Sequence, residues 1–376
     1  MTNLSENGVN AGLLAVLRTV AALLFSFVLF SLFLLVIGAN PGEVFGYMLQ
    51  GSVGSSFSLQ NTILMSAPLL LVAFCTALPA KLGMVVIGGE GALVVGGLAA
   101  AAAGYILKDA AYAISITGMF LASFVSAGVW IGLIGLLKQY KGANETIVSL
   151  LLNYIAIALL NHLVEGALRD PASLNKPSTH HIGMEHMLGK LPGTDIHYGV
   201  VMGIVVALIL YFIYHWTTFG FSVRIAGGNS KAARLAGLSL SKIILITFFL
   251  AGGVAGLAGF VEVTAVHGRA NASLAAGYGY TGILVAFLAR QHPVAIIPVT
   301  FLFGALAASN GLIQRRCELP DATMIVLQGI IFVTIIGWDA IAAGFNFNSI
   351  KATKLYSYGA RILVNPFGNY RRSYKS

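Results

Sequence analysis

One carboxylate, Glu90, lies well inside an apolar run of the sequence, GMVVIGGEGALVVGG. An acid in hydrocarbon is costly unless it faces a cavity, finds a partner or takes up a proton. The flanking Gly88, Gly89 and Gly91 weaken a helix at this point, and a break there frees backbone amides that can bind a polar ligand. We therefore predict that Glu90 lies on a transport path. The alternative is that Glu90 bonds to a neighbouring helix and fixes its packing.

Amide side chains form a second group of polar residues in apolar segments. Asn153 and Asn161 are eight residues apart, which places them close to the same face of a helix. Hydrogen bonds between helices are the default role for such amides. Asn310, further along the chain, is another amide in an apolar run, and the same role is its default. The candidate residues of a substrate path are Glu90, Gly88, Gly89, Asn153, Asn161 and Asn310.

Motifs for catalysis, metal binding or nucleotide binding are weak. The segment HHIGMEH, residues 180–186, lacks the spacing of the zinc motifs and is better interpreted as a solvated loop. The segment GYGYTG, residues 277–282, matches a dinucleotide pattern without the strand or the acid that the pattern needs. It is better interpreted as a flexible or unwound entry to a membrane segment. The sequence contains no Walker A motif and no catalytic triad. We therefore expect no enzyme activity, metal or cofactor.

The elements that position these residues must be membrane helices. Only 9% of the 376 residues are charged and 57% are hydrophobic, whereas a soluble domain carries roughly 25% charged residues. We predict an all-α polytopic membrane protein with about ten transmembrane helices. The apolar runs lie near 19–37, 61–79, 82–106, 112–137, 145–164, 198–214, 243–262, 279–290, 294–313 and 323–342. The run at 279–290 is too short to span alone, so it is either a half-helix or starts earlier, near Ala270.

The charges of the connecting segments predict the orientation. Basic residues gather in alternate loops, which contain no acids before the tail apart from Glu6 and Glu145, and the positive-inside rule places these loops in the cytosol together with both termini. The basic residues are Arg18, Lys81, Lys138, Lys141, Arg224, Lys231, Arg234, Lys242 and Arg290. The pattern therefore predicts a chain that crosses its membrane many times, and the resemblance described below implies that this is the bacterial inner membrane.

The same pattern predicts how the chain is divided. Residues 1–18 form a cytosolic N-terminal segment, residues 19–343 the transmembrane domain, and residues 344–376 a basic cytosolic tail. The domain carries two long loops, an outer one at 165–197 and a cytosolic one at 215–242.

The cytosolic loop contains a polar, basic and helix-prone stretch, NSKAARLAGLSLSK. Asn229 or Ser230 can cap a short helix there, and Gly237 can end or bend it. A surface helix between two spans is a natural docking point for a cytosolic partner, and a solvated connector is the equally simple alternative.

Four segments, in this order, carry a resemblance to a known family. They are GMVVIGGEGALVVGGLAAA, KGANETIVSLLLNYIA, RIAGGNSKAARLAGLSLSKIILITFFLAGGVAGLAGFVEVTAVHGR and GYGYTGILVAFLARQHPVAIIPVTFLFGALAASNG. Together they resemble the permease subunit of ABC importers in the superfamily of ribose and branched-chain amino acid permeases. They are most similar to the nucleoside branch that works with basic-membrane-protein-type binding lipoproteins.

The resemblance implies partners as well as a function. It implies a permease that translocates nucleosides, or related ribosyl or simple-sugar compounds, by alternating access. A cytosolic ABC ATPase subunit would supply the energy, a second permease subunit or a copy of this chain would complete the path, and an extracytoplasmic substrate-binding lipoprotein would deliver the substrate. The stretch 230–241 would be the coupling helix, with Ser230, Lys231, Ala232, Arg234 and Gly237 as the ATPase-coupling residues.

A second hypothesis of a different class is a stand-alone secondary transporter. Glu90 would then be a proton- or ion-coupling carboxylate in a helix broken by glycines. This hypothesis leaves the polar stretch at 230–241 unexplained, and the sequence shows no inverted repeat.

Overall fold

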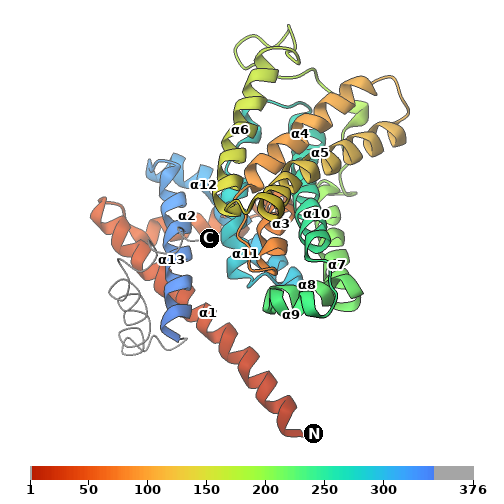
Figure 1. Ribbon diagram of the computed structural model, residues 1–376. Coiled ribbons are helices and arrows are strands. Elements are labelled where there is room, and N and C mark those ends of the chain that lie inside the picture. Colours follow the sequence, from red (N-terminus) through yellow and green to blue (C-terminus); the bar gives the residue numbers. More distant parts are fainter. Residues whose placement is uncertain (1, 343–376) are drawn as a thin grey trace, which may run out of the picture. The chain divides into compact units, whose positions relative to one another are not determined.

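The computed structural model describes residues 2–342, and the side chains of 19–338. The predicted basic tail, 344–376, lies outside the described residues. The described chain consists of thirteen α-helices with short 3-10 and π turns, and no strand occurs within 2–342 (Figure 1). The all-α prediction is therefore confirmed. The chain divides into two compact units, one comprising 31–328 and the other comprising the two ends of the chain.

Eight helices are long and apolar enough to cross a membrane. They are α1 (Thr2–Val36), α3 (Ser56–Ala80), α4 (Gly89–Ile106), α5 (Tyr112–Lys141), α6 (Glu145–Glu165), α7 (Gly199–Trp216), α10 (Leu240–Val261) and α12 (Pro293–Cys317). The shorter apolar helices α11 (Tyr278–Leu288) and α13 (Ala322–Ala342) bring the number of apolar segments to the predicted ten.

The unit formed by the chain ends contains most of α1 and the second half of α13. Within it, the rings of Phe25 and Trp338 lie with their centroids 6.3 Å apart. Helix α1 begins at Thr2, so it continues through the segment 1–18 that the sequence suggested as a separate cytosolic element.

The centre of the larger unit is α10, which packs against α5, α4 and α3 (Figure 1). Its glycines let other backbones approach closely. A Cβ on Gly256 would lie 2.4 Å from the Cβ of Ala127, and one on Gly259 would lie 2.0 Å from the carbonyl oxygen of Leu93. In lipid no hydrophobic force brings helices together, so the close packing that small residues allow at such crossings stabilises the contact instead. This packing holds α4 at a fixed height against α10.

Three predicted boundaries were wrong. The run 82–106 is not helical throughout, because helix α4 begins only at Gly89 and residues 84–87 have no regular structure. The predicted coupling helix at 230–241 is shorter, since α9 covers Ser230–Leu235 and α10 already begins at Leu240. The predicted run 294–313 ends too early, because helix α12 continues to Cys317.

Two helices were missed by the sequence analysis. Helix α2 (Pro41–Val53) is capped by the side chain of Asn40 and packs along α12. Helix α8 (Thr218–Gly228) is capped by Thr217 and precedes α9. Helices of 11–13 residues are shorter than a span and carry too weak a periodic signal to stand out from polar loops.

Candidate functional site

The buried Glu90 carboxylate joins the starts of two helices. Its Oε1 accepts a hydrogen bond of 2.7 Å from the backbone N–H of Gly277, and its Oε2 accepts one from the N–H of Gly279. Glu90 is itself in the first turn of α4, and Gly277 is the residue before α11. The first N–H groups of a helix lack partners within the helix, and its N-terminus carries partial positive charge. The Glu90 carboxylate, at the start of α4, therefore accepts hydrogen bonds from amides at the start of α11 that have no partner within that helix.

Glycine permits this end-to-end arrangement. Gly277 has φ +87°, in the left-handed region, where residues with a side chain are disfavoured. A Cβ on Gly279 would lie 2.0 Å from the backbone nitrogen of Glu90. The GYGYTG segment is therefore the N-terminus of a half-length helix, held by two hydrogen bonds to Glu90, and the residues that lead into it are not α-helical. Of the two alternatives for 279–290, the half-helix is confirmed, because Ala272–Leu274 forms a separate 3-10 turn.

A third helix is tied to this junction by Asn153 of α6. Its Oδ1 accepts a hydrogen bond from the N–H of Gly91, and its Nδ2 donates one of 2.8 Å to the hydroxyl of Tyr280. Asn153 is fully buried. We call Glu90, Gly91, Asn153, Gly277 and Gly279 the helix-break junction.

The non-helical residues that lead into α4 are held by hydroxyl side chains. Thr76 Oγ1 donates to the carbonyl of Val86 at 2.8 Å, and Thr146 Oγ1 donates to that of Val85 at 3.0 Å. The N–H of Ile87 donates to Ser149 Oγ at 3.0 Å. Backbone without helical hydrogen bonds is tolerated at membrane depth only when such partners are present.

The predicted path residues separate into two groups. Gly88, Gly89 and Asn153 lie with Glu90 around the junction. Asn161 is exposed on α6, and Asn310 of α12 donates to Asp321 at 3.3 Å, so neither joins the other four. The freed amides at the start of α11 bind Glu90 instead of standing open for a ligand. This geometry corresponds to the packing role that the sequence left open, and a transport role for these residues stays a prediction.

A cavity of about 540 Å³ lies beside the start of α11. The sequence analysis did not identify it as a site. Its polar lining residues include Asn61, His197, Glu262, His267 and Tyr278, and its apolar lining residues are Leu64, Met65, Ala265, Val266 and Ala276. Lys190 and Asp195, which pair at 2.8 Å, also line it. Tyr278 belongs to the first turn of α11, so the cavity adjoins the helix-break junction.

The acidic residue of this cavity, Glu262, lies at the point where α10 widens into a π-helical turn, Glu262–His267. In a π-helix the hydrogen bond joins residues five apart, and the N–H of Gly268 donates to the carbonyl of Val263 at 2.8 Å. The wider turn brings His267 Nε2 to 3.3 Å from Glu262 Oε2. Glu262 is the last residue of the predicted run 243–262, and it was not among the predicted path residues.

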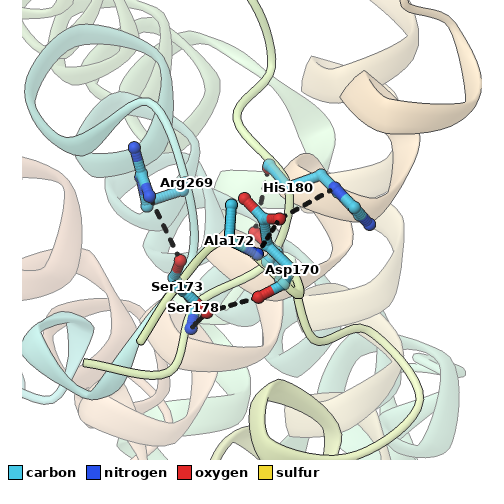
Figure 2. A network of polar contacts seen from close by, with 7 residues as sticks. Asp170, Ala172, Ser173, Ser178, His180 and Arg269 are labelled. Carbon is cyan, nitrogen blue, oxygen red and sulfur yellow. Dashed lines mark hydrogen bonds and ion pairs between the residues drawn. The ribbon is translucent and has the colours of Figure 1, made fainter. Parts of the chain in front are cut away.

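The long loop 165–197 is folded onto the segment that follows the π-helical turn. The N–H of Thr179 donates to the carbonyl of Ala270 at 2.9 Å, and the N–H of Ala270 donates back to Thr179 Oγ1 at 2.9 Å. Figure 2 shows the surrounding contacts, in which Arg269 donates to Ser178 Oγ and Asp170 lies 3.6 Å from His180 Nδ1. These contacts join the loop and the segment 268–271 into one surface, whose residues 190–197 border the cavity.

The histidines of this loop have separate partners. His186 Nε2 lies 2.8 Å from the carbonyl oxygen of Lys108, and His181 Nδ1 accepts a hydrogen bond from the N–H of Gly183. Within the segment 180–186, predicted to be a solvated loop, Met184 and Glu185 are exposed whereas His186 is buried, so the segment is only partly solvated. Within the described residues, no group of three His, Cys, Asp or Glu side chains could hold a metal ion.

The second predicted functional region is α9, at the end of the bundle opposite to the loop after α6 (Figure 1). Asn229 Oδ1 caps the helix by accepting from the N–H groups of Lys231 and Ala232, which confirms one of the two predicted caps. Gly237, at φ +77°, follows the helix and turns the chain toward α10. The exposed residues are Ser230, Lys231, Ala232, Arg234, Leu235 and Gly237, with Leu235 90% exposed.

The structure combines apolar spans, two helices that begin inside the bundle at a shared carboxylate, and an adjoining cavity with polar lining residues. Together these features are typical of a membrane transport protein. Residues 58–336 match the family model described as branched-chain amino acid transport system / permease component, and the chain belongs to this family. The resemblance identified from the sequence is therefore confirmed. The family and the eight apolar spans also confirm a multi-pass inner-membrane protein, and a transport subunit rather than an enzyme.

Named relatives cover most of the chain. The glucose ABC transporter permease protein TsgB13 of Haloferax volcanii is 29% identical over 81% of this chain and 82% of its own length. The guanosine ABC transporter permease protein NupP of Bacillus subtilis is 28% identical over 83% of this chain and 90% of its own length. The nucleoside ABC transporter permease protein NupB of Lactococcus lactis is 24% identical over 84% of this chain and 90% of its own length.

Proposed function

We propose that the chain is the permease subunit of an ABC importer that translocates nucleosides or related ribosyl or simple-sugar compounds. The observation that carries the substrate proposal is the cavity of about 540 Å³ next to the start of α11, which is lined by both polar and apolar side chains. Pockets of about 300–1,000 Å³ bind small organic molecules. A compound with an apolar part and a hydroxylated part can contact both kinds of side chain. The names of the guanosine, nucleoside and glucose relatives support the same substrate class.

We propose that α9 docks on a cytosolic ATPase subunit. It is capped, exposed and basic, and it is continuous through Gly237 with α10, which carries Glu262 at its far end. A push on α9 would therefore reach the cavity through a helix that packs against α3, α4 and α5. Alternating access would follow, with closed ATPases opening the path outward and hydrolysis returning it inward. A second permease subunit, or a second copy of this chain, would complete the path.

The surface formed by the loop 165–197 and the segment 268–271 is the proposed contact for an extracytoplasmic binding lipoprotein. It borders the cavity and is held by backbone hydrogen bonds rather than by side chains alone. The loop charges predict that this surface faces outward, while α9 faces the cytosol.

Two measurements test the proposed function. The tagged chain should retain an ATPase on purification, and cells should take up labelled guanosine only while that ATPase is active. Uptake of glucose in parallel distinguishes the nucleoside from the sugar alternative. Uptake that persists with an inactive ATPase, or purification that never retains an ATPase, would contradict the importer proposal.

The alternative, an ion-coupled secondary transporter that uses Glu90, has less support. Both carboxylate oxygens accept hydrogen bonds from backbone N–H groups, and the residue is only 1% exposed. An ion or proton would have to displace a helix start to reach it. Purified protein in liposomes, given an ion gradient and no ATP, should therefore show no uptake.

A further inference from the structure

The two oxygens of the Glu262 carboxylate have different surroundings. Its Oε2 lies 3.3 Å from His267 Nε2, whereas no group within the described residues donates to its Oε1. The Glu262 side chain is only 6% exposed, and it lines the cavity. A buried carboxylate needs hydrogen-bond donors to offset the loss of water. The open oxygen therefore marks a place where a ligand can supply them.

The surroundings of this carboxylate limit the charge of that ligand. An anion would be repelled by Glu262. His267 already lies against this carboxylate, and Lys190, which also lines the cavity, is paired with Asp195. A neutral ligand of the class named in the proposed function can offer several O–H donors to the carboxylate. The apolar lining residues Met65, Ala265 and Val266 can contact a less polar part of the same molecule.

We propose that Glu262, positioned by His267, recognises the vicinal hydroxyl groups of a ribosyl ligand in this cavity. This inference rests on the proposed function and names its specificity-determining residue. Two adjacent hydroxyls can donate to one carboxylate, which has about four acceptor positions. The π-helical turn contributes to this arrangement, because it places His267 against one oxygen of Glu262 and leaves the other oxygen to the ligand in the proposal.

The proposal predicts discrimination by hydroxyl groups. A site built to hydrogen-bond a hydroxyl rejects an analogue that lacks it, because the buried acceptor is left without a partner. In nanodiscs, the full chain should therefore have an affinity for labelled guanosine that is at least about tenfold higher than its affinity for 2′,3′-dideoxyguanosine, which is measured by competition. Glu262→Gln should weaken guanosine binding by about tenfold and bring the two affinities close together. Glu185→Gln, which removes an exposed acid outside the cavity wall, is the matched control and should keep the wild-type ratio.

The outcomes separate this inference from the proposed function. An unchanged affinity ratio in Glu262→Gln would overturn the role of Glu262, even if the assembled transporter imports guanosine. Guanosine uptake by the transporter without any binding to the nanodisc protein would overturn it as well. Uptake of neither nucleosides nor sugars by the complete transporter would instead overturn the proposed function. If Glu262→Gln does not fold, Glu262→Asp keeps the charge but withdraws the oxygen by one methylene, and it should also reduce the ratio.

Discussion

Nδ2 of Asn153 lies 2.8 Å from the hydroxyl oxygen of Tyr280, so helices α6 and α11 share a hydrogen bond between residues 127 positions apart. The same amide accepts from the N–H of Gly91 through its Oδ1. Asn153 thereby connects α6 with the starts of both α4 and α11. Its two contacts differ in burial, since Tyr280 is 40% exposed and Gly91 is buried.

This difference leads to a prediction for a double-mutant cycle. Tyr280→Phe should cost about 0.5–1.5 kcal/mol, because it removes one hydrogen bond from a partly exposed hydroxyl. Asn153→Ala should cost more, because it also leaves the buried N–H of Gly91 without an acceptor. In a denaturant titration the double variant should cost less than the sum of the two single changes, because their shared hydrogen bond is lost only once. Tyr154→Phe, on an exposed neighbouring position, is the control and should be close to neutral.

Glu90→Gln should destabilise the helix-break junction. The amide group of glutamine offers one acceptor oxygen and one donor nitrogen, so one of the N–H groups of Gly277 and Gly279 loses its partner. A buried unsatisfied donor costs about 1–3 kcal/mol. Thermal unfolding in detergent should show the loss, and uptake should fall with it. Glu165→Gln, at the exposed end of α6, is the control for stability and should leave the melting temperature unchanged.

Gly279→Ala should be strongly unfavourable although alanine is the better helix former. The added methyl would lie 2.0 Å from the nitrogen of Glu90, which belongs to backbone and has no room to move away. Overpacking of this kind costs about 1–3 kcal/mol. Gly132→Ala in α5 is the matched control, since no atom lies within 4 Å of the position that its methyl group would take. It should be neutral or slightly stabilising, and equal effects of the two changes would contradict the close contact of α4 and α11.

The stability of the protein should fall in mild acid, partly through His197. Burial lowers the pKa of His197 below the ordinary value of 6.5. The unfolded chain therefore binds a proton at this position before the folded chain does, and the unfolded state gains stability as the pH falls below about 6.5. The melting temperature should drop between about pH 7.5 and about pH 5.5. His197→Gln should reduce that drop, and a larger drop in the variant would contradict the assignment.

Changes in α9 should separate ATP hydrolysis from transport. Arg234→Glu reverses an exposed charge, and Gly237→Pro forbids the left-handed conformation that turns the chain into α10. Both variants should stay in the membrane and lose uptake while ATPase activity persists. Arg316→Glu, an exposed position in the last turn of α12 that lies outside both α9 and the loop 165–197, controls for the charge change alone. Normal uptake in both α9 variants would count against the docking role.

The membrane fold follows directly from composition and periodicity. A chain with long apolar runs and only 9% charged residues cannot fold as a water-soluble protein. The helices and their approximate positions are therefore set by the sequence. The cap of α9 by Asn229 is equally local, since it involves a side chain and the amides two and three residues later. Such features need no information from distant parts of the chain.

The helix-break junction and the cavity needed the tertiary structure. The sequence identified Glu90 as an isolated acid, yet its partners lie 187 and 189 residues away, at the start of a helix whose length was itself ambiguous. Glu262 was not predicted as a site residue, because the π-helical turn that pairs it with His267 has no signature in hydropathy. Local pattern therefore determined which segments enter the membrane. Long-range packing decided which polar groups meet there, because buried donors and acceptors find their partners only where the helices cross.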